Sequence, residues 1–260
     1  GWRTAQPVTE INSDGNEGAP SLSADGQYLF FTACEEMYHS SNQRKTNGSC
    51  DIFIAKKTGD KYANPRNLDL PVNTGAWESQ PSFSSDGRTL YFVRAVKGSN
   101  NVSQHDIFMS RIGDDARWSD PVSVSSKINT SADELSVFIH PDDQTLYFSS
   151  NGHTGMGGQD IFYSKRDSSG EWSEPINIGY PINTPSDEAS LLVSPDGKIG
   201  FFSSDRPGGK GGEDLYQFDL YEKARPQPVT YMKGKVFDDD TKLPLAASFE
   251  LIDLATGKII

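Results

Sequence analysis

The strongest constraint on the fold of this chain is a sequence pattern that recurs four times. Each copy contains an asparagine, a glutamate five residues after it, an aspartate eight residues after the glutamate, and a closing aspartate. The closing residues are Asp51, Asp106, Asp160 and Asp214, separated by 55, 54 and 54 residues. Repeats of this length and regularity indicate one structural unit that is built four times and packs against its own copies.

Each copy predicts four short β-strands. In the fourth copy, apolar and polar residues alternate through SLLVS and KIGFFSS, which is the period of a strand with one buried face. An Asp-Gly pair follows the first run in three copies and predicts a tight hairpin turn. These pairs are Asp25-Gly26, Asp86-Gly87 and Asp196-Gly197. The third copy has Asp143 in place of the glycine, and aspartate tolerates the positive φ that the turn requires.

A DIF or DLY triplet opens the third run of each copy, and a segment such as Trp-Ser-x-Pro opens the fourth. Four strands per repeat predict an all-β fold, a β-propeller of four-stranded blades. The segment from Trp2 to Pro7 loosely matches the fourth run, so the N-terminus could complete the last blade and close a ring of four. Alternatively, the four repeats are part of a larger ring.

The charge balance excludes some partners. The formal net charge is −12, from 24 basic and 36 acidic residues, and a surface of that sign repels phosphate groups. We therefore expect neither nucleic acid nor anionic lipid as a partner. No apolar run reaches the roughly 18 residues that a membrane-spanning helix needs, so no direct membrane insertion by this segment is expected.

Two stretches carry a resemblance to a known family. SPDGKIGFFSSDRPGGKGGEDLYQF and HPDDQTLYFSSNGHTGMGGQDIF resemble the TolB-type, WD40-like (PD40) propeller repeats of bacterial envelope proteins. Their GGKGGED and GMGGQD loops are similar to those of Bacteroidetes OmpA-family lipoproteins. TYMKGKVFDDDTKLPLAASFELIDLATGKII resembles the start of a carboxypeptidase-regulatory-like β-sandwich. The expected domains are a propeller over 1–224, a linker over 225–229 and an incomplete sandwich over 230–260.

The resemblance implies a function. Proteins of this kind are periplasmic and outer-membrane-associated, are tethered to peptidoglycan, and include secretion-system components. We therefore expect an interaction scaffold that binds envelope proteins, needs no cofactor and is not an enzyme. The alternative is a propeller that binds glycan or peptidoglycan, and a glycoside-processing enzyme is less favoured. The sequence contains no G-x-S-x-G, P-loop or H-E-x-x-H motif.

The two cysteines are predicted to form a disulfide. Cys34 and Cys50 occupy the places of Asp205 and Glu213 in the fourth copy, which are the two ends of one hairpin loop. A metal pair is the alternative, but no further Cys or His pair is spaced to complete such a site. A disulfide here favours an oxidising compartment such as the periplasm.

The recurring glutamates are predicted to begin the innermost strand of each blade, where they would face the central channel. A ring of carboxylates there could hold a cation such as Ca²⁺. The alternative, which we favour, is that each glutamate accepts backbone hydrogen bonds and locks the blades together. The four residues are Glu17, Glu78, Glu134 and Glu188.

The hairpin loops 34–50, 94–105, 151–159 and 205–213 should project from one side of the ring. They differ in length and character while the strands stay uniform, and variable loops on a rigid scaffold often carry binding residues. The candidate partner-binding residues in the first two loops are Tyr38, Arg44, Lys45, Arg94 and Lys97.

Overall fold

The computed structural model describes residues 4–34, 44–98, 103–230 and 236–245, together with positions 250, 252 and 257. The chain divides into two compact units, residues 1–230 and 231–260, and each is described by itself. Among the described residues of the first unit the regular structure is β-strand, apart from one short 3-10 helix, η1 (Glu222–Ala224). The predicted all-β fold class is confirmed.

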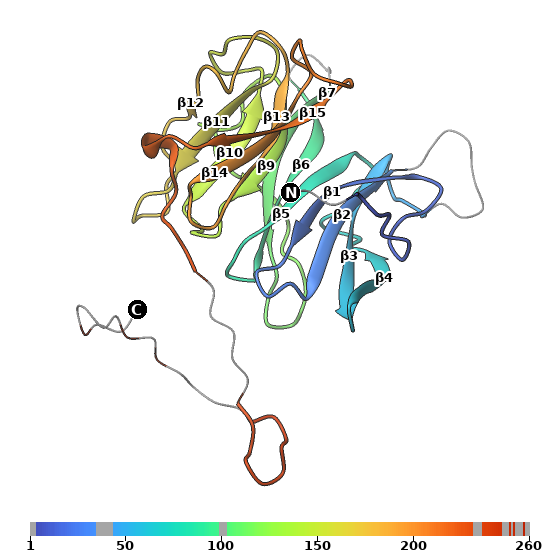
Figure 1. The fold of residues 1–260 in the computed structure, drawn as a ribbon. Helices are drawn as coiled ribbons and strands as arrows, with labels where there is room; N and C mark the ends of the chain where they lie inside the picture. The colour runs from blue at the N-terminus through green and yellow to red at the C-terminus, as the bar shows by residue number, and fades with distance from the viewer. Residues whose placement is uncertain are drawn as a thin grey trace. The chain divides into compact units, whose positions relative to one another are not determined.

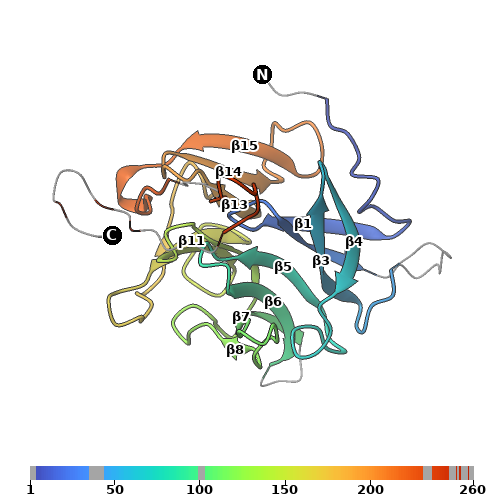
Figure 2. The same cartoon turned by 90° about the horizontal axis from the view of Figure 1, so that it is seen from below.

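Four antiparallel sheets form the blades of a β-propeller (Figure 1, Figure 2). Blade 1 contains β1 (Asn16–Leu22), β2 (Tyr28–Cys34), β3 (Cys50–Thr58) and β4 (Lys61–Asn67). Blade 2 contains β5 (Glu78–Phe83), β6 (Thr89–Lys97), β7 (Ser103–Arg111) and β8 (Val122–Ser123). Blade 3 contains β9 (Glu134–Ile139), β10 (Thr145–Ser150), β11 (Asp160–Lys165) and β12 (Ile176–Asn177). Blade 4 contains β13 (Glu188–Val193), β14 (Ile199–Ser204) and β15 (Asp214–Asp219).

The predicted hairpin turns join the first two strands of each blade. Gly26, Gly87 and Gly197 have φ of 65°, 68° and 72°, the left-handed region that glycine enters without steric cost. Asp143 takes the same conformation, with φ of 54°. Its carboxylate also accepts hydrogen bonds from the Ser85 N–H at 2.9 Å and the Ser85 hydroxyl at 2.7 Å, which joins the turn of blade 3 to that of blade 2.

Apolar cores lie between neighbouring blades. Between blades 1 and 2, Phe30 and Ile52 pack with Leu90 and Phe92. Equivalent cores form between blades 2 and 3 and between blades 3 and 4. An isoleucine on the third strand lies in each core with 0% of its surface exposed; the three are Ile52, Ile107 and Ile161. The blades are thus held to one another mainly by apolar burial.

A recurring pair of hydrogen bonds from an asparagine side chain, which we call the asparagine clasp, ties each of these isoleucines to the next blade. The Asn73 side chain accepts the Ile52 N–H at 2.9 Å and donates to the Ile52 carbonyl oxygen at 2.8 Å. Asn129 binds Ile107, and Asn183 binds Ile161, through the same two bonds. Each clasp therefore satisfies both backbone groups of a buried residue across a blade boundary.

The four blades do not close on themselves. β1 packs against β5, β5 against β9, and β9 against β13, but the strands of blade 4 do not pack in this way on those of blade 1. Blade 4 has three strands, with β15 at its edge, and residues 4–15 contain no strand. Among the described residues, 4–15 therefore do not complete the last blade, and Trp2, where that predicted strand would begin, lies outside them.

In the second unit, residues 236–245 form a turn closed by a bridge between Phe237 and Pro244. The Thr241 N–H and hydroxyl donate to Asp238 Oδ1 at 2.7 and 2.8 Å. The regulatory-like sandwich predicted for 230–260 stays a prediction. None of the helical structure in the described parts of the chain is long and apolar enough to cross a membrane.

Candidate functional site

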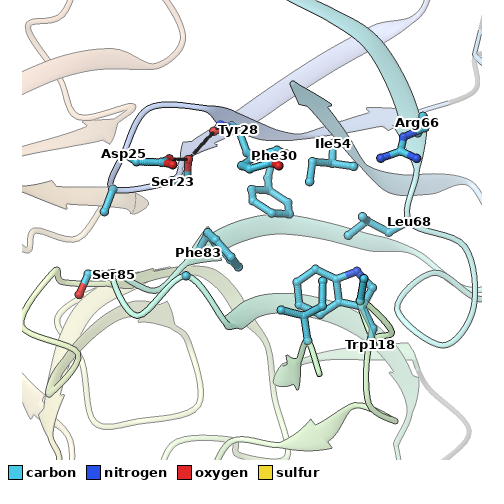
Figure 3. Close-up of a pocket in the computed structure, with 14 residues that line it drawn as sticks. Ser23, Asp25, Tyr28, Phe30, Ile54, Arg66, Leu68, Phe83, Ser85 and Trp118 are labelled. Carbon is cyan, nitrogen blue, oxygen red and sulfur yellow. Dashed lines mark hydrogen bonds between the residues drawn. The ribbon is translucent and has the colours of Figure 1, made fainter. Parts of the chain in front are cut away.

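An open apolar cleft lies between blades 1 and 2. Its cavity has a volume of about 670 Å³, and it opens among the β1–β2 and β5–β6 turns (Figure 3). The main lining side chains are Phe30, Ile54, Leu68, Phe83 and Trp118, with the exposed Arg66 at the rim. The loops that the sequence singled out leave the other end of β2 and β6, so this cleft lies on the opposite side of the propeller.

Three aromatic rings form the floor of the cleft. The ring centroids of Phe30 and Phe83 are 4.5 Å apart, and the Trp118 ring lies 6.4 Å from each of them in an edge-to-face arrangement. Phe30 projects from β2, Phe83 from β5, and Trp118 from the turn before β8. Contact of this kind between three elements fixes the rings, so the cleft offers a rigid aromatic surface.

The equivalent cleft between blades 2 and 3 has a different lining. Arg166 lies over the Trp172 ring at 4.4 Å from its centroid and donates to the Tyr91 hydroxyl at 2.6 Å. The cavity there is smaller, about 480 Å³, and includes Arg111, Arg166 and Glu171. In the cleft between blades 1 and 2, the positions of Tyr91 and Arg166 are held by Phe30 and Ile112. Two substitutions between repeats thus account for its apolar character.

The equivalent cleft between blades 3 and 4 is occupied by the chain itself. Residues 221–229, which we call the strap, run across it and include the segment expected to be a linker. The buried Tyr147 hydroxyl donates to the Ala224 carbonyl oxygen at 2.6 Å, and Lys165 donates to that of Arg225 at 2.7 Å. Burial raises the pKa of Tyr147, so its hydroxyl remains protonated as a donor.

The strap is also anchored by the turns of blades 3 and 4. The Gln227 N–H donates to Asp142 Oδ2 at 2.9 Å, and the Val229 N–H donates to the Pro195 carbonyl oxygen at 2.9 Å. Burial by itself raises the pKa of Asp142, but hydrogen bonds outweigh it and lower the pKa to about 2. The donors are the Thr145 hydroxyl and the backbone N–H groups of Gln144 and Gln227, and the His140 ring lies beside the carboxylate.

This lowered pKa predicts an acid-sensitive contribution to stability. Because the folded-state pKa lies below the ordinary value, the contribution is complete above pH ~4 to 5 and is lost as the pH falls towards the folded-state value. We expect Asp142→Asn to lower the free energy of unfolding by about 2 kcal/mol at pH 6, with the difference vanishing near pH 2. Urea denaturation of both proteins across this range measures it; a difference independent of pH would contradict the assignment.

Two of the predicted partner-binding residues have structural roles instead. The Arg94 guanidinium donates to the Val72 carbonyl oxygen at 2.8 Å, lies 2.9 Å from the Glu78 carboxylate, and covers the rings of Phe92 and Phe108. Arg44 likewise bonds the Ile11 carbonyl oxygen and covers Phe31 and Phe53. Both cations therefore contact their own blade, and a partner-binding role for them stays a prediction.

Arg206 repeats this arrangement in blade 4, bonding the Pro181 carbonyl oxygen at 2.9 Å and lying over the rings of Phe202 and Tyr216. In blade 3 the His153 ring takes the place of the arginine. Of the other predicted loop residues, Lys45 and Lys97 are exposed, and Tyr38 lies outside the described residues. A binding role for these three stays a prediction.

The recurring glutamates are bonded within their own repeats. Glu78 accepts hydrogen bonds from the Thr74 N–H at 3.0 Å and the Thr74 hydroxyl at 2.6 Å. Glu17, Glu134 and Glu188 accept the same pair of bonds from the residue four positions before them. Burial raises the pKa of Glu134. Throughout the described part of the chain, no cluster of His, Cys, Asp or Glu is arranged to hold a metal ion.

The predicted disulfide is present. Cys34 and Cys50 lie opposite each other at the ends of β2 and β3 and are joined by an S–S bond of 2.02 Å. In three of the repeats the closing aspartate binds the loop before it: Asp51, Asp160 and Asp214 each accept backbone N–H groups there. The apolar cleft itself was missed, although the change from Tyr91 and Arg166 to Phe30 and Ile112 is readable in the aligned repeats.

No protein-family model matches this chain, and no curated protein matches it. Among solved structures, TolB from Acinetobacter baumannii is similar with a TM-score of 0.52 at 14% identity. The match covers 86% of this chain and 46% of TolB, so this chain spans less than half of that protein. A GH43 endo-arabinanase from Bacillus licheniformis is similar with a TM-score of 0.50 at 16% identity, covering 81% of this chain and 76% of the enzyme.

At these identities the likeness shows the fold alone, and it confirms the β-propeller. It also corrects the expectation that the chain is not an enzyme. The endo-arabinanase has a fold similar to that of this chain, so this architecture includes enzymes. The lack of a familiar catalytic motif in the sequence was therefore insufficient to exclude catalysis.

Proposed function

We propose that this chain is a protein-interaction module of the bacterial periplasm, within an outer-membrane-associated, OmpA-family-like protein. In this proposal it binds an extended segment of an envelope protein in the cleft between blades 1 and 2. The observation that carries the proposal is the strap. The equivalent cleft between blades 3 and 4 already holds a polypeptide segment, residues 221–229, while the cleft between blades 1 and 2 is open and apolar.

The chemistry of the open cleft favours an apolar, proline-containing segment. The strap includes Pro226 and Pro228, and its chain is extended on both sides of η1. Grooves lined by aromatic side chains recognise proline-rich segments because those segments are already extended and lose little conformational entropy on binding. Phe30, Phe83 and Trp118 supply such a lining. The periplasmic location is supported by the disulfide, which requires an oxidising compartment.

Two substitutions can fill the cleft between blades 1 and 2 with the side chains that stand at the equivalent positions of the neighbouring cleft. In the double variant Phe30→Tyr/Ile112→Arg, the new arginine and tyrosine repeat the Arg166–Tyr91 pair of the neighbouring cleft. We expect this variant to fold normally and to lose binding of the partner about tenfold or more. The matched control is Ile176→Arg, which adds the same charge at an exposed position on β12, outside the cleft.

The test exposes the three immobilised proteins to detergent-solubilised Gram-negative envelope and, separately, to purified muropeptides. Thermal unfolding first verifies that all three are folded. A defined envelope protein that binds the unaltered chain and Ile176→Arg, but not the double variant, supports the proposal. Retention of muropeptides alone would favour the glycan-binding alternative, and equal capture by all three proteins would remove the cleft from consideration.

A further inference from the structure

A proline of the strap lies against the turn that joins the first two strands of blade 4. Pro226 is buried there, and a methyl group placed on Gly197 of the turn would lie 3.0 Å from Pro226 Cδ, closer than ordinary van der Waals contact. The equivalent residue of blade 2, Gly87, lines the cleft between blades 1 and 2. A methyl group on Gly87 would meet no atom of the described residues within 4 Å. The place that the proline takes in one cleft is thus open in the other.

Hydrogen bonds on either side of Pro226 fix the direction in which the strap runs. The carbonyl oxygen of the residue before it accepts from Lys165 at 2.7 Å, and the N–H of the residue after it donates to Asp142 at 2.9 Å. The repeats place Lys56 and Asp25 at the positions of Lys165 and Asp142. A segment that repeats these contacts in the cleft between blades 1 and 2 therefore meets Lys56 before its proline and Asp25 after it.

A second cavity adjoins the cleft beside blade 1, and it is basic. Its volume is about 210 Å³, and it shares Tyr28, Ile54 and Arg66 with the cleft and adds Lys56. Figure 3 shows Arg66 at the other end of the cleft from Asp25. Both cations are exposed, no carboxylate belongs to the lining of this cavity, and within the described residues neither cation forms an ion pair. The cavity is therefore suited to a carboxylate.

Charge distinguishes this cleft from the one that the strap occupies. The fourth strands of blades 2 and 3 carry Val122 and Ile176 at the register position of Arg66, so the cation is particular to blade 1. The strap itself carries Lys223 and Arg225 in the stretch before its buried proline. Those two side chains would be repelled by the basic cavity, whereas acidic side chains at the same places would be attracted.

On the basis of the function proposed above, we propose that the cleft between blades 1 and 2 selects a segment with acidic residues directly before a proline. The proline lies on Gly87, the carboxylates before it reach Lys56 and Arg66, and the N–H after it donates to Asp25. The bound segment follows the path of the strap but has the opposite charge. The same cations exclude the strap and other basic segments, so the specificity includes a repulsive element.

The probes are two synthetic peptides of the strap's length. One has the strap sequence YEKARPQPV, and the other, YEEAEPQPV, has glutamate in place of both basic residues. Calorimetric titration of the whole chain measures each dissociation constant at low ionic strength. We expect the acidic peptide to bind about tenfold more tightly than the strap peptide or better. The double variant Phe30→Tyr/Ile112→Arg should lose binding of the acidic peptide, because the cleft is filled.

Reversal of one charge tests the selection directly. Arg66→Glu should reverse the preference, so that the strap peptide binds more tightly than the acidic one. The matched control is Lys210→Glu, at an exposed position in the loop between β14 and β15, which should leave the preference unchanged. Arg66 is exposed as well, and thermal unfolding verifies that both variants are folded.

The outcomes separate this inference from the proposed function. Equal binding of both peptides that is lost in the cleft double variant would leave the cleft as a binding site and overturn the charge selection. An unchanged preference in Arg66→Glu, or acidic-peptide binding that survives the double variant, would also overturn it. If neither peptide binds, the strap is not a template for the bound segment, and the capture of envelope proteins tests the proposed function separately. Tighter binding of a fatty acid such as laurate would assign the cleft to a lipid instead.

Discussion

Replacing Asn183 with alanine is expected to lower the free energy of unfolding of the propeller by about 3 kcal/mol. Its buried side chain binds both backbone groups of Ile161 and donates to Asn177 Oδ1 at 2.7 Å. Alanine would leave the N–H of a fully buried residue without a partner, at a cost of roughly 1–3 kcal/mol, and would remove one of the two hydrogen bonds to its carbonyl oxygen, which keeps the Ile178 N–H at 3.0 Å. Urea denaturation followed by tryptophan fluorescence measures the loss.

The matched control is Asn12→Ala at the same repeat position. Asn12 is exposed, so the change in the free energy of unfolding should stay within about 0.5 kcal/mol. Near-equal losses for the two variants would show that the asparagines act within their own loops rather than across blade boundaries. The contrast therefore tests the clasp itself.

Removing the disulfide is the second change with a large expected effect. Cys34 and Cys50 are separated by 16 positions, and releasing a loop of this size is expected to cost about 3 kcal/mol, since the unfolded chain gains conformational freedom. The free energy of unfolding of the double variant Cys34→Ser/Cys50→Ser, compared with the unaltered chain, measures the effect.

Reductant provides the control for this prediction. It should lower the stability of the unaltered chain by a similar amount and leave the serine double variant unchanged. A loss that reductant does not reproduce would mean that the serine side chains, and not the missing bond, destabilise the protein. No loss at all would show that the cross-link does not constrain the unfolded chain.

The blades themselves were predictable because their signals are local. The alternation in KIGFFSS and the turn at Asp196-Gly197 each act over a few residues, and four copies repeat them. The turn of the third repeat, which has Asp143 in place of glycine, was also predicted correctly, since Asp143 adopts the predicted positive φ. The disulfide followed from the same alignment, which placed Cys34 and Cys50 at the two ends of one hairpin.

The roles of the arginines were not predictable by the same means. Arg44, Arg94 and Arg206 reach one kind of site, an aromatic pair beside a buried glutamate, from different positions in loops of different lengths. Alignment of the repeats does not place them together, so Arg44 and Arg94 looked like variable loop residues. Only the folded path of each loop shows that the cation returns to its own blade.

The cleft and the open ends depend on relations between distant residues. Phe30 and Ile112 matter as a pair because blades 1 and 2 face each other, and neither residue is unusual in its own repeat. The exposure of Leu215 likewise depends on whether a blade follows it in space. Periodicity predicts which face of a strand is apolar, but it does not predict what covers that face.

The strap also determines how the propeller would respond to mechanical force. It is the last part of the first unit before Thr230, so tension applied from the C-terminal side reaches its anchors first. Those anchors are the bonds from Val229 to Pro195 and from Gln227 to Asp142. A pull would therefore peel the strap out of the cleft between blades 3 and 4 before it loads any strand of a blade, and would expose the Tyr147 hydroxyl while the sheets remain intact.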